Sequence, residues 1–252
     1  MEINGKKVIV IGGASGMGRA SAELLAAKGA SVAILDREGS DGQAVADGLG
    51  GAFYTVDVTD FEGTEATLAA AVEALGGLHV VVTTAGGGIG ERTLGKKGPH
   101  DLDSFRRTID LNLIASFNIS RLAASHMAKN EPEDEERGVI INTASIAAFE
   151  GQIGQVAYTA AKAGIAGMCL TMARDLGSLG IRALAIAPSL FATGLTKGIP
   201  DEFANALTKD AAFPKRLGRP EEYAKLVAAI VDNAMLNGQC LRLDAGQRFA
   251  PK

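Results

Sequence analysis

The sequence is poor in the residues that build metal centres and disulfide frameworks. It holds two cysteines, three histidines and no tryptophan among 252 residues. The histidines, His79, His100 and His126, do not cluster at metal-ligand spacing, so we expect no metal ion. The cysteines, Cys169 and Cys240, lie in apolar contexts. This argues against a disulfide scaffold and predicts a reducing compartment, the cytoplasm.

Long apolar runs and an excess of positive charge are also missing. No run reaches the roughly 18 apolar residues that a membrane-spanning helix needs. Residues 1–5 lead directly into a predicted strand, which leaves no room for a signal peptide. The net charge is −4 and the isoelectric point is about 5.5, which argues against non-specific binding to nucleic acid. We therefore expect neither a membrane nor a nucleic-acid partner.

What the sequence does contain is a regular alternation of β-branched apolar runs and helical patterns. Such runs are typical of parallel strands buried on both faces. Their alternation with helices predicts a doubly wound, Rossmann-like α/β fold with a parallel sheet of about seven strands. We find no linker or repeat, so residues 1–252 are predicted to form a single domain. The predicted strands are 7–11, 31–35, 52–56, 79–82, 139–143, 181–187 and 239–243.

A glycine-rich turn follows the first predicted strand and opens a helix. Gly12 permits the tight turn, Gly16 lets the backbone approach a pyrophosphate, and Gly18 allows the helix to pack closely on the strand. Free N–H groups at the helix N-terminus complete the predicted phosphate site, which includes Ser15 and Met17. The spacing Gly-x-x-x-Gly-x-Gly differs from the usual Gly-x-Gly-x-x-Gly, and a plain glycine-rich turn is the alternative.

Acidic residues follow the second and third predicted strands, where the adenosine half of a dinucleotide would lie. Asp36 is placed to bond the ribose hydroxyls and to repel a 2′-phosphate, so NAD is favoured over NADP. Arg37 weakens this preference, because it could pair with a phosphate. Asp57, next to Val58, is a candidate partner of the adenine amino group, although either aspartate could simply cap a turn or a helix. Small residues after the fourth strand would let the cofactor approach the backbone: Thr84, Ala85 and Gly86.

A hydroxyl, a phenol and an ammonium group occur close together after the fifth predicted strand. Ser145 follows the run 139–143, at the end where open α/β sheets bind ligands. Tyr158 and Lys162 are four residues apart in a helical run, so they lie on one face, one turn apart. A nearby ammonium would lower the phenol pKa from about 10, so that Tyr158 could exchange a proton with an alcohol or a carbonyl. An ordinary helix with one tyrosine and one lysine is the alternative.

Residues 190–215 carry too many large apolar side chains for a solvated loop. We therefore expect this segment to close over a ligand as a lid, with Leu195 and Phe203 among the substrate contacts. The apolar set is Leu190, Phe191, Leu195, Ile199, Phe203, Leu207 and Phe213.

Taken together, these residues resemble the short-chain dehydrogenase/reductase family over the whole chain. The matching features are Gly12, Gly16-Met17-Gly18, Asp36, Asp57-Val58, Ala85-Gly86, Asn112, Ser145, Tyr158, Lys162 and Pro188 to Thr193. Longer stretches are similar to a narrower group, the type 10 17β-hydroxysteroid dehydrogenases, also called type 2 3-hydroxyacyl-CoA dehydrogenases. These stretches include 137–145, 148–152 and 241–244.

The resemblance implies a role for each matching residue. Tyr158 would be the acid/base, Lys162 would lower its pKa and bond the nicotinamide ribose, and Ser145 would orient the substrate oxygen. Asn112 would hold a water that links Lys162 to solvent. The implied cofactor contacts near the lid are Pro188, Phe191 and Thr193. The resemblance further implies NAD(H), an acyl-CoA or steroid-like substrate, and a homotetramer.

Three positions depart from the family pattern. Ile11 stands where the family usually has Thr, Thr83-Thr84 replaces an Asn pair that braces the sheet, and Ser189 replaces the Gly after Pro188. None of these changes touches the group that carries the proton. We therefore expect them to tune cofactor fit and to leave the chemistry intact.

The leading hypothesis is an NAD-dependent oxidoreductase that interconverts a 3-hydroxyacyl-CoA and its 3-oxo form, with hydroxysteroids as further substrates. One alternative is a 3-oxoacyl-carrier-protein reductase that uses NADPH, against which Asp36 argues. The other is a non-catalytic assembly subunit that retains the fold, against which the intact set Ser145, Tyr158 and Lys162 argues.

Overall fold

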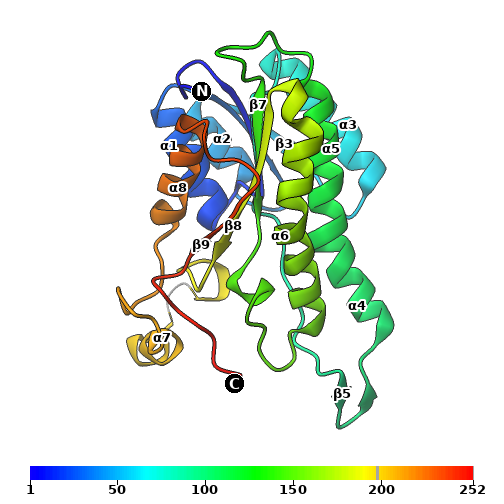
Figure 1. Cartoon of the computed structure of the whole chain (residues 1–252), viewed down its shortest axis with the longest axis vertical. Helices are drawn as coiled ribbons and strands as arrows, with labels where there is room; N and C mark the ends of the chain where they lie inside the picture. The colour runs from blue at the N-terminus through cyan, green and yellow to red at the C-terminus, as the bar shows by residue number, and fades with distance from the viewer. Residues whose placement is uncertain (197–198, 252) are drawn as a thin grey trace.

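A parallel sheet of seven strands forms the centre of the molecule in the computed structural model, which describes residues 1–196 and 199–251 (Figure 1). Its strand order is β3-β2-β1-β4-β7-β8-β9, so the Rossmann-like prediction is confirmed. The strands are β1 (Lys7–Ile11), β2 (Ser31–Asp36), β3 (Ala52–Thr55), β4 (Val80–Thr83), β7 (Gly138–Thr143), β8 (Ile181–Pro188) and β9 (Cys240–Leu243).

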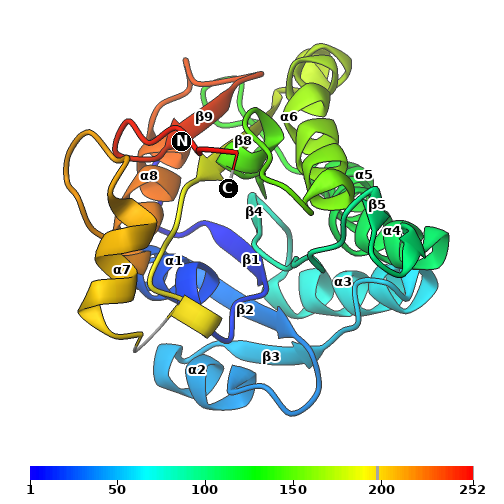
Figure 2. The same ribbon diagram turned by 90° about the horizontal axis from the view of Figure 1, so that it is seen from below.

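Helices cover both faces of this sheet (Figure 2). The α-helices are α1 (Gly16–Ala27), α2 (Gly42–Leu49), α3 (Phe61–Leu75), α4 (Leu102–Ile109), α5 (Ala115–Met127), α6 (Val156–Leu176), α7 (Asp201–Thr208) and α8 (Pro220–Asp232). Helices α1 and α8 pack on one face, and α3 and α5 pack on the other. The switch from β1–β2 to β1–β4 pairing opens the crevice at which such folds bind ligands.

Strand β1 shows why its sequence is a continuous apolar run. Val8 and Val10 belong to the core on the α1 and α8 face, whereas Ile9 and Ile11 belong to the core on the opposite face. All four are at most 1% exposed. Burying each such side chain contributes about 1.5–3 kcal/mol, so both faces of the central strand stabilise the sheet.

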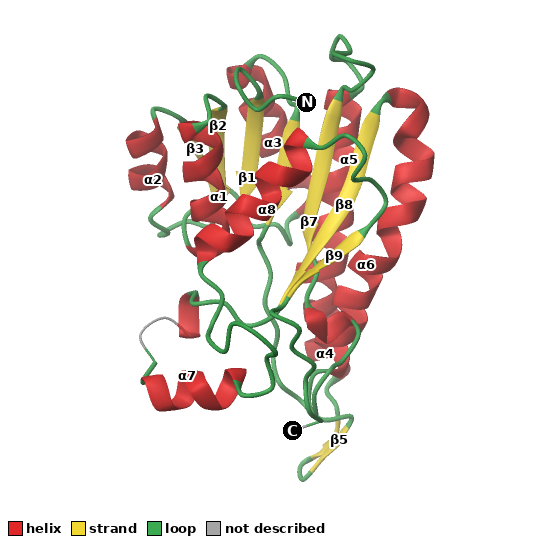
Figure 3. Cartoon of the chain, turned by 60° about the vertical axis from the view of Figure 1, so that its left-hand side comes forward, coloured by secondary structure: helices red, strands yellow, loops and turns green. Residues whose placement is uncertain are grey.

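Two elements at the carboxyl end of the sheet lie outside this layered body (Figure 3). One is a small hairpin of β5 (Leu94–Gly95) and β6 (Gly98–Pro99), and the other is the lid segment that carries η4 (Gly194–Thr196) and α7. Residues 197 and 198 of the predicted lid lie outside the described residues.

A π-helical segment separates the two α-helices that follow the hairpin. Helix α4 passes into η1 (Asp110–Ile114) before α5 begins. One face of this stretch carries small buried polar residues, and the side chains of Thr108, Asn112, Ser116 and Ser120 each donate to the carbonyl four residues earlier.

Helix α6 is long and apolar enough to cross a membrane by length and composition alone, with a mean hydropathy of 1.2. In this fold it packs on the sheet and carries the buried Lys162. Core helices of compact proteins share this composition, so the feature is weak evidence for a membrane span.

Candidate active site

The junction of β1 and α1 requires all three glycines of the turn. Gly12 has φ +80°, and a Cβ there would lie 2.7 Å from the backbone nitrogen of Ala85. Gly16 has φ +51°, and a Cβ on Gly18 would lie 2.2 Å from the carbonyl oxygen of Gly12. Ser15 caps α1 in an extended conformation, and its side chain makes no capping bond to the helix. The first N–H groups of α1 thus remain suited to an anion.

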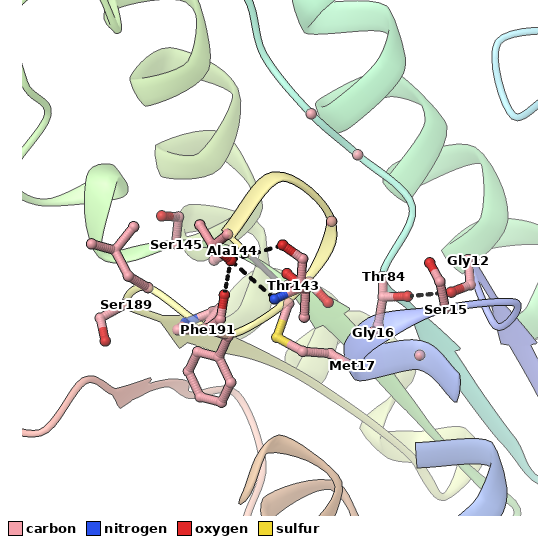
Figure 4. A pocket seen from close by; sticks show the side chains of 18 of the residues that line it. Gly12, Ser15, Gly16, Met17, Thr84, Thr143, Ala144, Ser145, Ser189 and Phe191 are labelled. Atoms are coloured by element: carbon pink, nitrogen blue, oxygen red, sulfur yellow. Dashed lines mark hydrogen bonds between the residues drawn. The ribbon is translucent and has the colours of Figure 1, made fainter. Parts of the chain in front are cut away.

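Thr84 braces this turn, contrary to the expectation that the Thr83-Thr84 pair loses the brace. Its Oγ1 lies 3.1 Å from the carbonyl oxygens of both Ile11 and Gly12, and Figure 4 shows the bond to Gly12. Its backbone N–H also donates to the Ile11 carbonyl at 2.8 Å. The threonine hydroxyl therefore performs the sheet-bracing task that the resemblance assigned to an amide.

Asp36 faces the glycine turn from the end of β2. Its Oδ2 accepts from the Ala14 N–H at 2.9 Å, and its Oδ1 accepts from the Arg37 N–H at 2.7 Å. Asp57 accepts from both the hydroxyl and the N–H of Thr59, and these bonds lower the pKa of its carboxyl. One Asp57 oxygen is thus engaged in a turn, as the alternative interpretation proposed.

Two cavities together contain every predicted cofactor residue. A cavity of about 260 Å³ is lined by Asp36, Asp57, Val58 and Ala85, with Gly12, Ser15, Thr84 and Gly86. A second cavity of about 420 Å³ shares the last four residues. It also holds Gly16, Met17, Gly18, Ser145, Tyr158, Lys162, Pro188, Phe191 and Thr193. This cradle of glycines, N–H groups and a carboxylate fits a nicotinamide dinucleotide.

Lys162 is directed at a backbone carbonyl that the sequence did not single out. Its Nζ donates to the carbonyl oxygen of Thr143 at 2.7 Å, and the side chain is buried. The Thr143 hydroxyl donates to the Thr83 carbonyl at 2.6 Å, so the buried Tyr223 hydroxyl, 2.7 Å away, must donate to it. The end of β7 is thereby fixed beneath the ammonium.

The two ionisable groups of the site shift in opposite directions. Burial lowers the pKa of Lys162 from 10.5 to about 8. Burial raises the pKa of Tyr158, and hydrogen bonding with Ser145 offsets only part of this rise. In this structure burial therefore outweighs the lowering of the phenol pKa that the sequence suggested. The ammonium bonds Thr143 and lies 5.5 Å from the centre of the Tyr158 ring.

Asn112 lies in the π-helical segment, behind the loop that lines the larger cavity. Its Nδ2 donates to the Gly87 carbonyl at 2.6 Å, and its Oδ1 accepts from the Gly87 N–H at 3.2 Å. A Cβ on Gly86 would lie 2.7 Å from the Asn112 Oδ1 and 3.3 Å from the Lys162 Nζ. Asn112 thus holds the loop close to Lys162 without lining the cavity itself.

The predicted lid lines the cavity with its first residues, whereas the described side chains farther along it lie outside the cavity. Phe191 is buried and lines the cavity, but Phe203 on α7 is 65% exposed and lines neither cavity. Phe213 is 84% exposed. Leu195 lies in η4, and its side chain is outside the described part of the structure. Phe203 therefore does not reach the cavity in this structure, because α7 stands away from the sheet (Figure 3), and its contact with a substrate stays a prediction.

Several cavity residues were missed because their signal is weak in a sequence. Thr143, Ala144, Ser189 and Leu190 line the larger cavity alongside the predicted residues. Their positions in the chain, next to Ser145 or close to Pro188, could have suggested them, because residues adjacent to a site residue at the end of a strand tend to lie at the same site. Ser189, which replaces a family glycine, fits easily because it is not among the residues with positive φ.

Among residues 1–196 and 199–251, no group of three or more histidine, cysteine, aspartate or glutamate side chains could hold a metal ion. The groups that can act here are the hydroxyl of Ser145, the phenol of Tyr158 and the ammonium of Lys162.

Comparison with known proteins agrees with this geometry. The chain is 48% identical to the 3-hydroxyacyl-CoA dehydrogenase type-2 of Bos taurus, over 99% of this chain and 97% of the relative. It is 47% identical to the protein of that name from Drosophila melanogaster, over 96% and 97%. The crystal structure of a 3-hydroxyacyl-CoA dehydrogenase type-2 from Mycobacterium avium matches with a TM-score of 0.91 and 41% identity, covering 99% of this chain and 98% of that one. The family model for short chain dehydrogenases matches residues 6–204, so the chain belongs to the short chain dehydrogenase family and is an oxidoreductase acting on CH–OH groups.

Proposed function

We propose that the protein is an NAD-dependent dehydrogenase that interconverts a 3-hydroxyacyl-CoA and a 3-oxoacyl-CoA, with hydroxysteroids as further substrates. The observation that carries the proposal is the common cavity of Ser145, Tyr158 and Lys162 beside the glycine turn. The printed names of the relatives support an acyl-CoA substrate, because the similarity extends over almost the full length of both chains.

Each of the three residues has one task in this reaction. A nicotinamide dinucleotide, when bound along the glycine turn, supplies or accepts the hydride. Tyr158 would give a proton to the substrate carbonyl oxygen during reduction and take it back during oxidation. Ser145 would hold that oxygen by a hydrogen bond. Lys162 would keep positive charge beneath the phenol and stabilise the phenolate once the proton has left.

The preference for NAD rests on Asp36. Its carboxylate lines the smaller cavity and is held by the N–H groups of Ala14 and Arg37. A phosphate on the adenosine ribose would meet this negative charge, whereas two ribose hydroxyls could donate to it. This argues against the alternative of an NADPH-dependent 3-oxoacyl-carrier-protein reductase.

We also propose a homotetramer in the cytoplasm. Exposed apolar side chains on the η1, α5 and α6 helices support subunit contacts, since they would otherwise face water. They are Ile114 (38% exposed), Phe117 (47%) and Leu170 (50%). The free thiols of Cys169 and Cys240 suit a reducing compartment.

The test is NADH oxidation by acetoacetyl-CoA in the wild type and in Tyr158→Phe. The variant is expected to lose at least about 100-fold in kcat, the scale of acid–base catalysis, while NADH binding by fluorescence stays within a few-fold. Tyr54→Phe on the edge strand β3 is the matched control, because Tyr54 lines neither cavity. Equal activity of Tyr158→Phe and the control would contradict the catalytic role and favour an assembly subunit.

A further inference from the structure

The C-terminal segment, residues 248–251, is bonded to the active-site loop, residues 149–155. This loop links the short helix η2 (Ile146–Ala148), which follows Ser145, to α6, which carries Tyr158. Three hydrogen bonds join the two segments: Phe249 N to Glu150 Oε2 at 3.1 Å, Gln152 Nε2 to the Ala250 carbonyl at 3.2 Å, and Ile153 N to the Pro251 carbonyl at 3.1 Å. The chain end lies near the mouth formed by the carboxyl ends of the strands (Figure 2).

Two carboxylates and two guanidinium groups form a network of ion pairs at this junction. Glu150 Oε1 pairs with Arg242 Nη1 at 2.8 Å and with Arg248 Nε at 3.3 Å. Asp244 Oδ2 pairs with Arg242 Nε at 2.7 Å and with Arg248 Nη1 at 3.0 Å. The Glu150, Arg242 and Asp244 side chains are only 21%, 23% and 10% exposed. Such a network is screened less than an isolated surface pair.

Glu150 is the residue through which both arginines act on the loop. Its second carboxylate oxygen accepts a hydrogen bond from the Phe249 N–H. The Glu150 side chain thus connects its own loop to Arg242 on β9 and to the C-terminal segment. The Arg242 guanidinium also lies 5.3 Å from the centre of the Phe149 ring. These contacts hold the loop at a point in the chain between Ser145 and Tyr158, the two residues that would contact the substrate oxygen.

We propose that Glu150 is a positioning residue, and that the C-terminal segment is a clamp that fixes Tyr158 relative to Ser145. The proposal rests on the proposed function, since the alignment matters only if both groups act on one oxygen. A displacement of about 1 Å in a catalytic group can reduce turnover by about 100-fold. In the described part of the chain, the hydrogen bonds and ion pairs of the clamp do not involve the glycine turn, so we expect dinucleotide binding not to depend on it.

The test compares wild type with Glu150→Gln, which keeps the side-chain size and removes the charge. With acetoacetyl-CoA and NADH we expect kcat to fall about tenfold and the NADH dissociation constant to stay within about twofold. Hydrogen exchange of peptides covering 149–157 should become faster. Arg248→Gln, at a side chain that is 60% exposed and so tolerant of change, should show the same pattern more weakly. Glu73→Gln, exposed on α3, is the control.

Each failure has a separate meaning. If kcat of the variants equals kcat of the control, the clamp is not a positioning device. The same conclusion follows if NADH affinity falls about as many fold as kcat and thermal stability falls with it, because the variants are then generally damaged. Unchanged exchange of 149–157 in both variants would also overturn the proposal. An inactive wild type would refute the acyl-CoA function instead, and the exchange measurement would still decide whether the charged network holds the loop.

Discussion

Replacing Lys162 by Met should abolish activity without unfolding the protein. The ammonium is buried, and its surroundings lower its pKa from 10.5 to about 8. Because one pKa unit corresponds to about 1.4 kcal/mol, holding this charge in the fold destabilises the protein by about 3 kcal/mol at neutral pH. The variant removes that penalty, but it also leaves the Thr143 carbonyl without its donor, which costs about 1–3 kcal/mol.

The two effects nearly cancel at pH 7, so Lys162→Met is expected to be as stable as the wild type or up to about 2 kcal/mol more stable. The pH dependence separates them. Between the folded pKa of about 8 and the ordinary value of 10.5, the unfolded chain binds more protons than the folded one. Wild-type stability therefore rises with pH in this window. Relative to the variant, the wild type should gain about 2 kcal/mol between pH 7 and about pH 9.5.

Urea unfolding of both proteins at fixed concentration and without added cofactor measures this difference. Lys225→Met, exposed on α8, is the control and should follow the wild type. Turnover of Lys162→Met should fall by at least about 100-fold. A stability difference that does not change between the two pH values would refute the assignment of a burial penalty to Lys162. A loss of more than about 3 kcal/mol at pH 7 would show that the Thr143 bond outweighs that penalty.

Three further substitutions test other parts of the structure. Asp36→Ser should raise kcat/KM for NADPH relative to NADH at least about tenfold, since a charge that repels phosphate is gone and Arg37 remains; an unchanged ratio in cofactor titrations would contradict this. Thr84→Val removes the hydroxyl that braces the turn, so fluorescence titration should show weaker NADH binding, whereas Thr84→Ser should bind normally. Glu136→Gln leaves the buried Arg182 without the carboxylate 2.7 Å away and should destabilise the fold by about 3–5 kcal/mol in urea; a loss below about 1 kcal/mol would contradict it.

The sheet was predictable because each strand carries its own signal. A run such as Val80–Thr83 is buried at every position and apolar in its first three residues, since both of its faces are covered. The glycine turn was equally predictable, because Gly12 and Gly16 adopt positive φ values that other residues reach only with strain. The strands and the glycine turn depend on residues that are close in sequence, so the sequence was sufficient to predict them.

Features that depend on distant partners were not predictable in the same way. Lys162 finds its acceptor in Thr143, nineteen residues away, and Thr84 braces a turn more than seventy residues before it. Asn112, in the π-helical segment, bonds both backbone groups of Gly87, which lies 25 residues before it, and the local sequence gives no signal for this pairing. The position of α7 could not be predicted for a related reason, since the apolar composition of residues 190–215 indicates burial but not where the helix lies.

The corrected pKa directions alter how the site should be understood. The sequence suggested a lysine that prepares Tyr158 as a base, yet burial raises the phenol pKa and lowers that of Lys162. At neutral pH the resting site therefore holds a neutral phenol above an ammonium that is bonded to Thr143. This state is ready to donate a proton to a carbonyl oxygen, which is the reductive direction. Oxidation by the proposed mechanism requires a phenolate, and the buried ammonium of Lys162, 5.5 Å from the centre of the Tyr158 ring, is placed to stabilise it.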